Sequence, residues 1–242
     1  MQTGKLSSRF PRAVNTALGL LFLVAPNAFA QQDYVPHYDL YGGFAYFESP
    51  HVDLAERGFH SQIGVNPKTW YGLGFDYSIA TGRLPLTPNL LPLSLQQQLG
   101  AELQRLATAG LIPPGFQLAI PVNSKTQTFA AGPQFNYRHF SRVTLFIRPS
   151  LGAIHENAVP RPQDPISSVI VMQLAPSGKK QDWAGFYGFG GGLDLNASKH
   201  LVLRMQADFV HDHLFNDLLK DGRNTVRVSV GPAFHFGRNV VQ

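Results

Sequence analysis

The chain of 242 residues contains no cysteine, so disulfides cannot hold it together in any compartment. It also has no uninterrupted apolar run of roughly 18 residues, and a helix that spans a bilayer needs about 20. A helical membrane protein is therefore excluded. A membrane β-barrel is not, because the residues of its strands alternate and average to a mean hydropathy near zero, as here.

The first thirty residues are typical of a secretory signal peptide. They contain a basic start, an apolar run too short to span a bilayer, and a small-residue cleavage pattern: Lys5, Arg9 and Arg12, then 17–25, then Ala28-Phe29-Ala30. We expect cleavage after Ala30 and a short periplasmic segment at 31–37. The alternative is a buried N-terminal helix.

Removal of this leader changes the charge balance. The leader carries three of the 20 basic residues and none of the 15 acidic ones, which leaves 17 basic residues against 15 acidic ones. The net charge of +5 is thus mostly a property of the leader. No nucleic-acid partner is expected.

Eight segments alternate between apolar and polar residues with the period of two that a half-buried strand requires. The last of them has valine and phenylalanine on one face and polar or small residues on the other. The expected strands are Tyr38–Phe47, Phe59–Asn66, Trp70–Ile79, 126–138, Val143–Ala153, Trp183–Asn196, Leu201–Val210 and Thr225–Phe236.

The end of the closing strand resembles the C-terminal insertion signal of bacterial outer-membrane barrels. That signal combines a polar residue, a glycine, an apolar residue and an aromatic one, here Ser229, Gly231, Phe234 and Phe236. The resemblance implies that the barrel-assembly machinery recognises this strand during insertion.

The expected links between strands alternate in length. Those at 67–69, 139–142 and 197–200 are short, and those at 48–58, 80–125, 154–182 and 211–224 are longer. Outer-membrane barrels have short periplasmic turns and longer extracellular loops. A soluble lipocalin-like barrel or β-sandwich would also have short alternating strands. The leader and the asymmetry of the links favour the membrane barrel.

Three segments resemble the last strands of small eight-stranded OmpA-like outer-membrane barrels, in particular a group common in acidobacteria. They are GGGLD at 190–194, SKHLVLRMQADFVHDHLF at 198–215 and NTVRVSVGPAFHFG at 224–237. The resemblance covers about 38–237 and implies an all-β fold, an eight-stranded antiparallel up-and-down transmembrane β-barrel. Members of this superfamily are structural anchors, adhesins, resistance factors and narrow channels, so the fold does not define the function.

The interior of so small a barrel is filled by side chains, and buried charges there must be paired. We expect a polar network in the lumen made of Asp76, Arg148, Asp194, Arg204, Asp208 and Arg227. The alternative is a narrow gated ion path. The glycines of 188–192 are expected to relieve crowding inside the barrel, because no helix follows them to make a phosphate loop.

The link at 80–125 is expected to be a long extracellular loop with an amphipathic helix at about 94–109. Ser94 and Gln97 would form a capping box, and Gly110 would end the helix. Its apolar stripe is Leu91, Leu95, Leu99, Leu103 and Leu106. The stripe can fold onto the barrel rim or onto its own loop partners, cover the lumen as a lid, touch the outer leaflet or bind a partner. Those loop partners are Leu111, Ile112, Phe116 and Ile120. A link of this length is more often functional than idle.

Three pairs of residues are candidates for metal binding or catalysis. His211 and His213 lie on one strand face, but a third metal ligand is not evident, so no metal or other cofactor is expected. Lipid deacylation needs a Ser–His pair near the outer leaflet, whereas His139 and Ser141 fall in a periplasmic turn. His155 with Glu156 in an outer loop remains a remote enzymatic alternative.

The sequence as a whole predicts a monomeric, non-enzymatic outer-membrane barrel that serves envelope integrity or surface interaction. The alternative is transport of a small solute through a path gated by the loop helix. The expected partners are outer-membrane lipid and lipopolysaccharide, together with an unidentified surface ligand.

Overall fold

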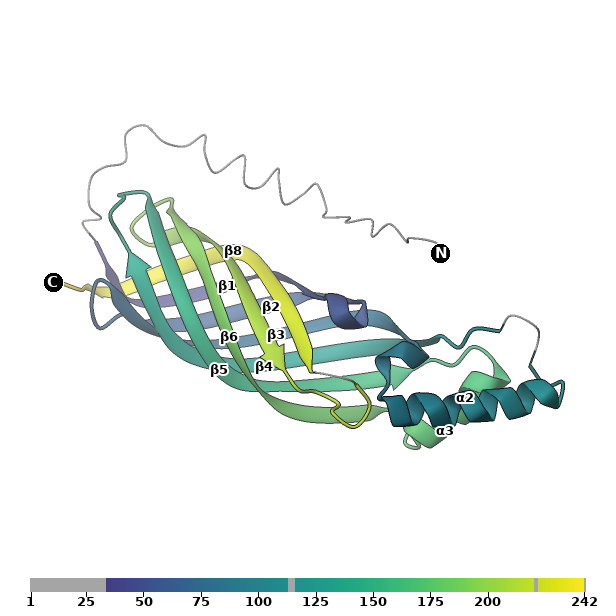
Figure 1. Ribbon diagram of the computed structural model, residues 1–242. Helices are drawn as coiled ribbons and strands as arrows, with labels where there is room; N and C mark the ends of the chain where they lie inside the picture. The colour runs from purple at the N-terminus through teal and green to yellow at the C-terminus, as the bar shows by residue number, and fades with distance from the viewer. Residues whose placement is uncertain (1–33, 113–115, 220–221, 242) are drawn as a thin grey trace, which may run out of the picture.

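The computed structural model describes residues 34–112, 116–219 and 222–241. The expected signal peptide, 1–30, and the start of the 31–37 segment lie outside the described residues. Within them, eight antiparallel strands follow one another around a closed barrel in chain order, and the last strand pairs with the first (Figure 1). This confirms the eight-stranded up-and-down fold expected from the alternating segments.

Each expected strand is present, and most are longer than expected. Their bounds are β1 Pro36–Ser49, β2 Leu54–Val65, β3 Tyr71–Leu86, β4 Ile120–Tyr137, β5 Val143–Pro160, β6 Lys180–Asn196, β7 Leu201–Asp212 and β8 Arg223–Asn239. The second long link therefore spans only 87–119. The alternation in fact continues beyond the expected ends, since Ile154, Glu156 and Ala158 of β5 still point inward.

One link differs in kind from the expectation. Residues 48–58 are not a long loop, because Ser49 of β1 pairs directly with Leu54 of β2. A single 3-10 turn, η2 (Pro50–Val52), joins them, and Asp53 takes the left-handed conformation at φ 52°. Asp53 tolerates that conformation because its short polar side chain has little steric conflict there. The barrel rim is thus lowest at β1 and β2.

The strands alternate between an apolar outside and a mostly polar inside. Leu151 is 70% exposed and Ile63 57%, whereas Asp76 and Thr144 are fully buried. The exposed apolar side chains encircle the barrel and are called the lipid belt below. It comprises Leu40, Phe44, Phe59, Ile63, Leu73, Phe75, Phe129, Phe135, Leu145, Ile147, Leu151, Phe189, Leu203, Phe209, Val226, Val228, Val230, Phe234 and Phe236.

The glycines of 188–192 lie inside β6 and make room in the wall, as expected. A Cβ at Gly190 would lie 1.9 Å from Asp208 Oδ1, and one at Gly192 would lie 2.7 Å from the ring of Phe146. Because these inward positions carry no side chain, a carboxylate and an aromatic ring fit beside them.

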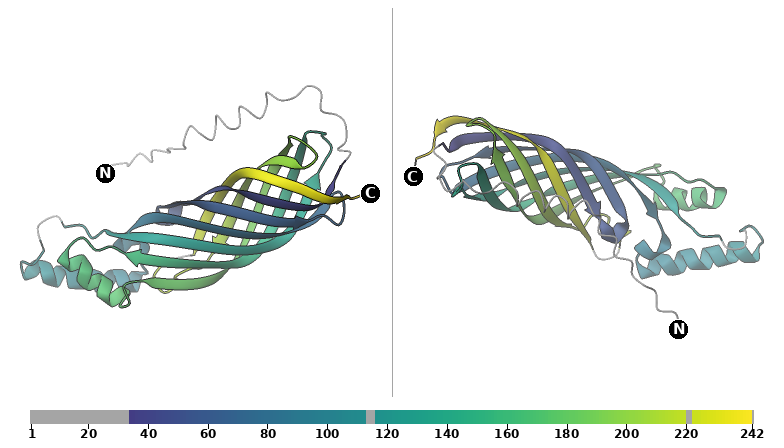
Figure 2. Two further views of the ribbon diagram at one scale, coloured as in Figure 1. Left: turned by 180° about the vertical axis from the view of Figure 1, so that it is seen from behind. Right: turned by 90° about the horizontal axis from the view of Figure 1, so that it is seen from above.

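Two α-helices of the described residues lie beyond the end of the barrel that is opposite the C-terminus (Figures 1 and 2). They are α2 (Leu93–Thr108), preceded by the turn η3 (Pro88–Leu90), and α3 (Pro165–Leu174). The sequence did not indicate α3, which falls in the expected link at 154–182. No helix among the described residues is long and apolar enough to cross a membrane.

Candidate functional site

The lumen contains a charged cluster in the half near the short turns. Arg204 of β7 lies opposite Asp194 of β6 in the strand register. Its Nε lies 2.8 Å from Asp194 Oδ1, and its Nη1 lies 3.1 Å from Asp39 Oδ1 and 3.0 Å from Gln62 Oε1. The guanidinium also stacks near the rings of Tyr41 and Phe146. This full set of partners is what a buried arginine needs.

A second charged cluster fills the middle of the lumen. Arg148 pairs with Asp76, and Arg227 Nη2 lies 2.8 Å from Asp208 Oδ2 and 3.6 Å from Asp76 Oδ2. Gln206 Nε2 donates to Asp208 at 2.8 Å. The structure therefore brings all six expected network residues into two clusters, with the arginine–aspartate partners adjacent.

Next to the second cluster lies a serine–histidine–aspartate constellation that sequence reasoning missed. His60 Nδ1 lies 3.0 Å from Ser229 Oγ, and His60 Nε2 lies 3.4 Å from Asp76 Oδ1. The same order of groups occurs in serine hydrolases. Here His60 and Asp76 are fully buried and Ser229 is 1% exposed, which leaves no route for a substrate. Ser229 gives His60 one polar partner, whereas His60 Nε2 and Asp76 Oδ1 form no hydrogen bond.

A third polar group closes the outer part of the lumen. Arg223 Nη1 lies 2.6 Å from Glu156 Oε2, and Arg223 Nε lies 3.2 Å from Asp212 Oδ2. Ser124 Oγ contacts both Glu56 Oε1, at 2.9 Å, and Glu156 Oε1, at 2.8 Å. The expected strand ends had placed Glu156 and Arg223 in loops. Continued alternation at both positions was the signal that could have placed them inside the barrel.

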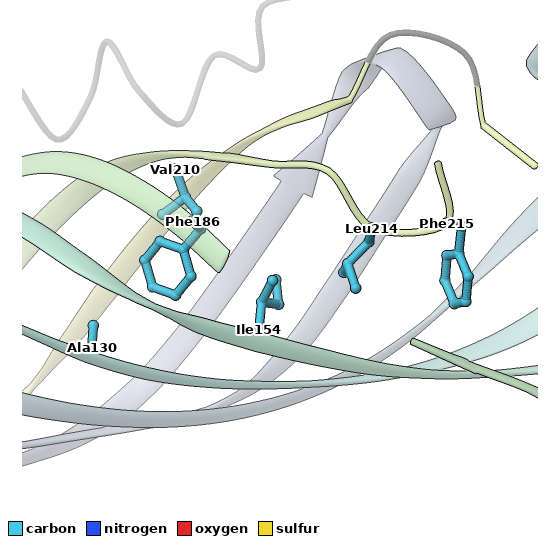
Figure 3. Packing of buried hydrophobic residues seen from close by; sticks show 6 residues of the cluster. All are labelled: Ala130, Ile154, Phe186, Val210, Leu214 and Phe215. Atoms are coloured by element: carbon cyan, nitrogen blue, oxygen red, sulfur yellow. The ribbon is translucent and has the colours of Figure 1, made fainter. Parts of the chain in front are cut away.

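Apolar side chains surround this outer polar group. One cluster inside the wall consists of Ala130, Ile154, Phe186, Val210, Leu214 and Phe215 (Figure 3). Leu214 and Phe215 come from the link between β7 and β8 and point toward the side chains of the strands. A second cluster, nearer the rim, consists of Val52, Leu54, Leu84 and Val122. The outer mouth is therefore apolar, unlike the rest of the lumen.

The helix α2 begins differently from the expectation. Its N-cap is Pro92, no side chain caps it, and Ser94 lies inside the first turn, so the expected capping box is absent. Gly110 ends the helix as expected, at φ +73°. The Gly110 N–H donates to Ala107 O and the Leu111 N–H to Leu106 O, both at 3.0 Å, which is the Schellman arrangement.

The expected leucine stripe of α2 faces α3 rather than the barrel lumen. Leu99 and Leu103 pack against Ile170 and Val171 of α3, together with Leu118 and Ile120 at the start of β4. An apolar groove remains between the two helices, and it encloses about 730 Å³. Its walls include Leu91, Leu95, Leu99, Leu103, Leu106, Ile166 and Val169. The two helices and this groove are called the helical module below.

The helix α3 has the side-chain cap that α2 lacks. Asp164 Oδ1 accepts the Ser167 N–H at 2.8 Å, and its Oδ2 accepts the Ser167 hydroxyl at 2.5 Å. These hydrogen bonds lower the pKa of the Asp164 carboxyl, because they favour its charged form.

Three histidines named as candidates, His155, His211 and His213, lie at the outer end of the barrel wall. His211 and His213 have ring centroids 4.8 Å apart, and no cluster of three possible metal ligands occurs in 34–112, 116–219 or 222–241. His155 stacks on Trp183 on the outer face, whereas Glu156 points inward, so the two are not a pair. Their separation follows from adjacent positions on one strand, which face opposite ways.

The residues of the C-terminal signal divide between the two faces of β8. Phe234 is 53% exposed and Phe236 46%, while Ser229 and Gly231 point inward. Phe236 stacks on Tyr38 of β1 at a centroid distance of 5.5 Å. The aromatic end of β8 thus lies on the seam where the barrel closes.

No protein-family model matches the sequence, and no curated protein matches it closely. The crystal structure of the outer-membrane protein OprG from Pseudomonas aeruginosa is similar, with a TM-score of 0.47 and 8% identity over 86% of this chain and 99% of that chain. Ail, the attachment invasion locus protein of Yersinia pestis, has a TM-score of 0.46 and 15% identity over 84% of this chain and 100% of that chain.

The N-terminal β-barrel domain of Pseudomonas aeruginosa OprF has a TM-score of 0.40 and 12% identity, over 86% of this chain and 100% of that chain. At such low identities the likeness concerns the fold alone. A closed barrel leaves no unpaired strand edge in lipid, and the apolar side chains of this barrel face outward. By strand order and polarity, the protein has the architecture of a small eight-stranded antiparallel transmembrane β-barrel.

Proposed function

We propose that this protein is a non-enzymatic outer-membrane barrel with a closed lumen, which presents the helical module as a contact surface outside the cell. The closed lumen follows from the three polar groups that fill it. Between the outer group and the middle cluster lies a gap of only about 10 Å³. That is about the space one water molecule needs.

The exposed apolar surface of the helical module supports the proposed contact function. Val169 is 51% exposed and Met172 62%, although both lie in the more apolar of the two helices. The only ion pair found within α2 joins Glu102, at the edge of the groove, to the exposed Arg105. A large exposed apolar surface with little charge is typical of a protein contact site. The partner it fits is an apolar segment of another surface protein, seated in the groove as helix-in-groove complexes are.

Conductance in planar bilayers tests the closed lumen. We expect no stepwise conductance from the full protein or from a variant that lacks 87–119, because the ion pairs lie below the helical module. Steps in the full protein would contradict the proposal. Steps that appear only on deletion would favour transport, with the loop as a lid.

Photo-cross-linking on living cells tests the contact surface. A cross-linking residue at Val169 should form an adduct with a specific surface protein, and one at Gln97 on the polar face of α2 should not. The adduct at Val169 should disappear when Leu95→Asp puts a charge in the groove. Adducts with lipopolysaccharide alone, or equal adducts from both positions, would contradict a protein partner.

A further inference from the structure

A pocket of about 70 Å³ lies at the outer mouth, between the barrel rim and the link that joins β7 to β8. Its walls come from several elements: Leu54 of β2, Leu84 of β3, Val122 of β4, and Phe215 and Leu219 of the link. Leu54 is 2% exposed and Val122 5%, so the walls are themselves well packed. Most of the wall is apolar, so water finds few hydrogen-bond partners there.

The polar groups at the inner end of the pocket are already paired. Glu156 and Arg223 line it, and they bind each other at 2.6 Å. Lys180 also lines it and pairs with Asp217. A charged ligand would have to break one of these pairs and leave a buried charge alone. An uncharged ligand would not.

The pocket is blind and lies outside the lipid belt. Below it, the outer polar group separates it from the lumen gap of about 10 Å³. On the outer surface at this level, the outward side chains include the cations Arg57, Arg83 and Lys125 next to the small apolar Ala55 and Pro85. A ligand therefore enters from water rather than from the bilayer, and does not continue through the barrel.

The link between β7 and β8 holds its apolar side chains toward the mouth by specific contacts. The Phe215 N–H donates to Asp182 Oδ2 at 2.5 Å, and the Leu214 N–H donates to Asp212 Oδ1 at 3.1 Å. Phe215 has φ +53°, a left-handed conformation that is unfavourable for a bulky residue. Strain of this kind persists where the surroundings hold it, often at ligand sites.

We propose that the pocket binds a small uncharged apolar molecule, or the short alkyl end of one, taken from the surrounding water. Its size decides the class of ligand. An apolar cavity of roughly 150 Å³ binds benzene or xenon, and this pocket has about half that volume. Xenon or a short alkyl group matches it, and a fused-ring compound does not.

Methyl NMR of the full protein in lipid nanodiscs, with xenon as the probe, tests the proposal. We expect saturable shifts in the methyl groups of Leu54, Leu84 and Leu219, with the methyl groups of the lipid belt changing only in proportion to xenon dissolved in the bilayer. Ala158→Phe should abolish the saturable shifts, because Ala158 also lines the pocket. Ala153→Phe is the matched control on the outer face of the same strand, and should leave them unchanged.

A second variant covers the case in which Ala158→Phe fails to fold, which heat-modifiable gel migration would reveal. Leu219→Ala enlarges the pocket and should allow 1-hexanol to give saturable shifts in the same methyl groups, more strongly than in the unaltered protein. Lipids with a spin label at the chain end distinguish the two sources of an alkyl group: relaxation of Leu84 by them would overturn entry from water. Shifts that survive Ala158→Phe, or an absence of saturable shifts, would overturn the pocket.

Discussion

Arg204 and Asp194 face each other across β6 and β7 and form a two-point ion pair. Arg204 Nε and Nη2 lie 2.8 Å and 2.9 Å from the two carboxylate oxygens of Asp194. Both side chains are at most 2% exposed. The pair is therefore shielded from solvent, and removal of one partner leaves the other as an uncompensated buried charge.

Arg204→Ala is expected to lower the free energy of unfolding by about 3–5 kcal/mol, because it removes the guanidinium that binds Asp194 and Asp39 inside the barrel. Urea unfolding in lipid vesicles, followed by the fluorescence of the two tryptophans, measures this. Arg105→Ala is the control, since that arginine forms an exposed pair on α2. An equal, small effect of both substitutions would show that the lumen pair does not stabilise the barrel.

Leu151→Arg tests the orientation of the wall. Leu151 is 70% exposed and lies near the middle of the lipid belt on β5, where a charge costs about 2–4 kcal/mol in the bilayer. Glu48→Arg, at the outer edge of β1, should cost about 0–1 kcal/mol by the same depth dependence. Unfolding in vesicles compares them, and similar costs at both positions would contradict the position assigned to the belt.

The cap of α3 should depend on pH. The pKa of Asp164 is lower in the folded protein than in the unfolded chain. The contribution of the charged Asp164 cap to stability is therefore complete above about pH 4, and it is lost as pH falls through the pKa of the folded protein. Amide exchange at Ser167 and Ser168 should thus be equally protected at pH 7 and pH 5. Asp164→Ala should speed it about fivefold, equivalent to the roughly 1 kcal/mol of an N-cap. Unchanged exchange in this variant would remove Asp164 as the cap.

The C-terminal signal should act during assembly more than in the folded barrel. Phe236→Ser and Phe209→Ser each remove one exposed aromatic side chain from the lipid belt, so their unfolding in vesicles should change by similar amounts. In cells, only Phe236→Ser should strongly reduce the folded, heat-modifiable protein in the outer membrane. Equal losses in cells would mean that Phe236 contributes burial alone.

Much of this architecture could be predicted because each β-strand carries its pattern locally. Alternation in residues 225–236 places Val228 and Arg227 on opposite faces, whichever strands lie next to them. The six network residues could be chosen on the same ground, since buried charges of opposite sign must meet. The expected ends of β3, β4 and β5 are too short, although alternation continues past them, because the small residues there also fit a loop.

The outer mouth was the least predictable region. Glu156 and Arg223 are 67 positions apart in the chain, and their pairing at 2.6 Å depends on barrel closure. Leu214 and Phe215 gave no periodic signal, because a single turn of the chain turns them toward the mouth. Likewise, α3 is too short and too uniformly apolar to show a helical stripe.

The sequence alone determined the fold class, the two faces of each strand, and the helix in the second long link, because periodicity is a local property of the chain. Tertiary structure alone decided which charges pair, that the leucine stripe faces α3, and that the outer mouth holds a mostly apolar pocket. These depend on register and on contacts between distant segments, which no local pattern records.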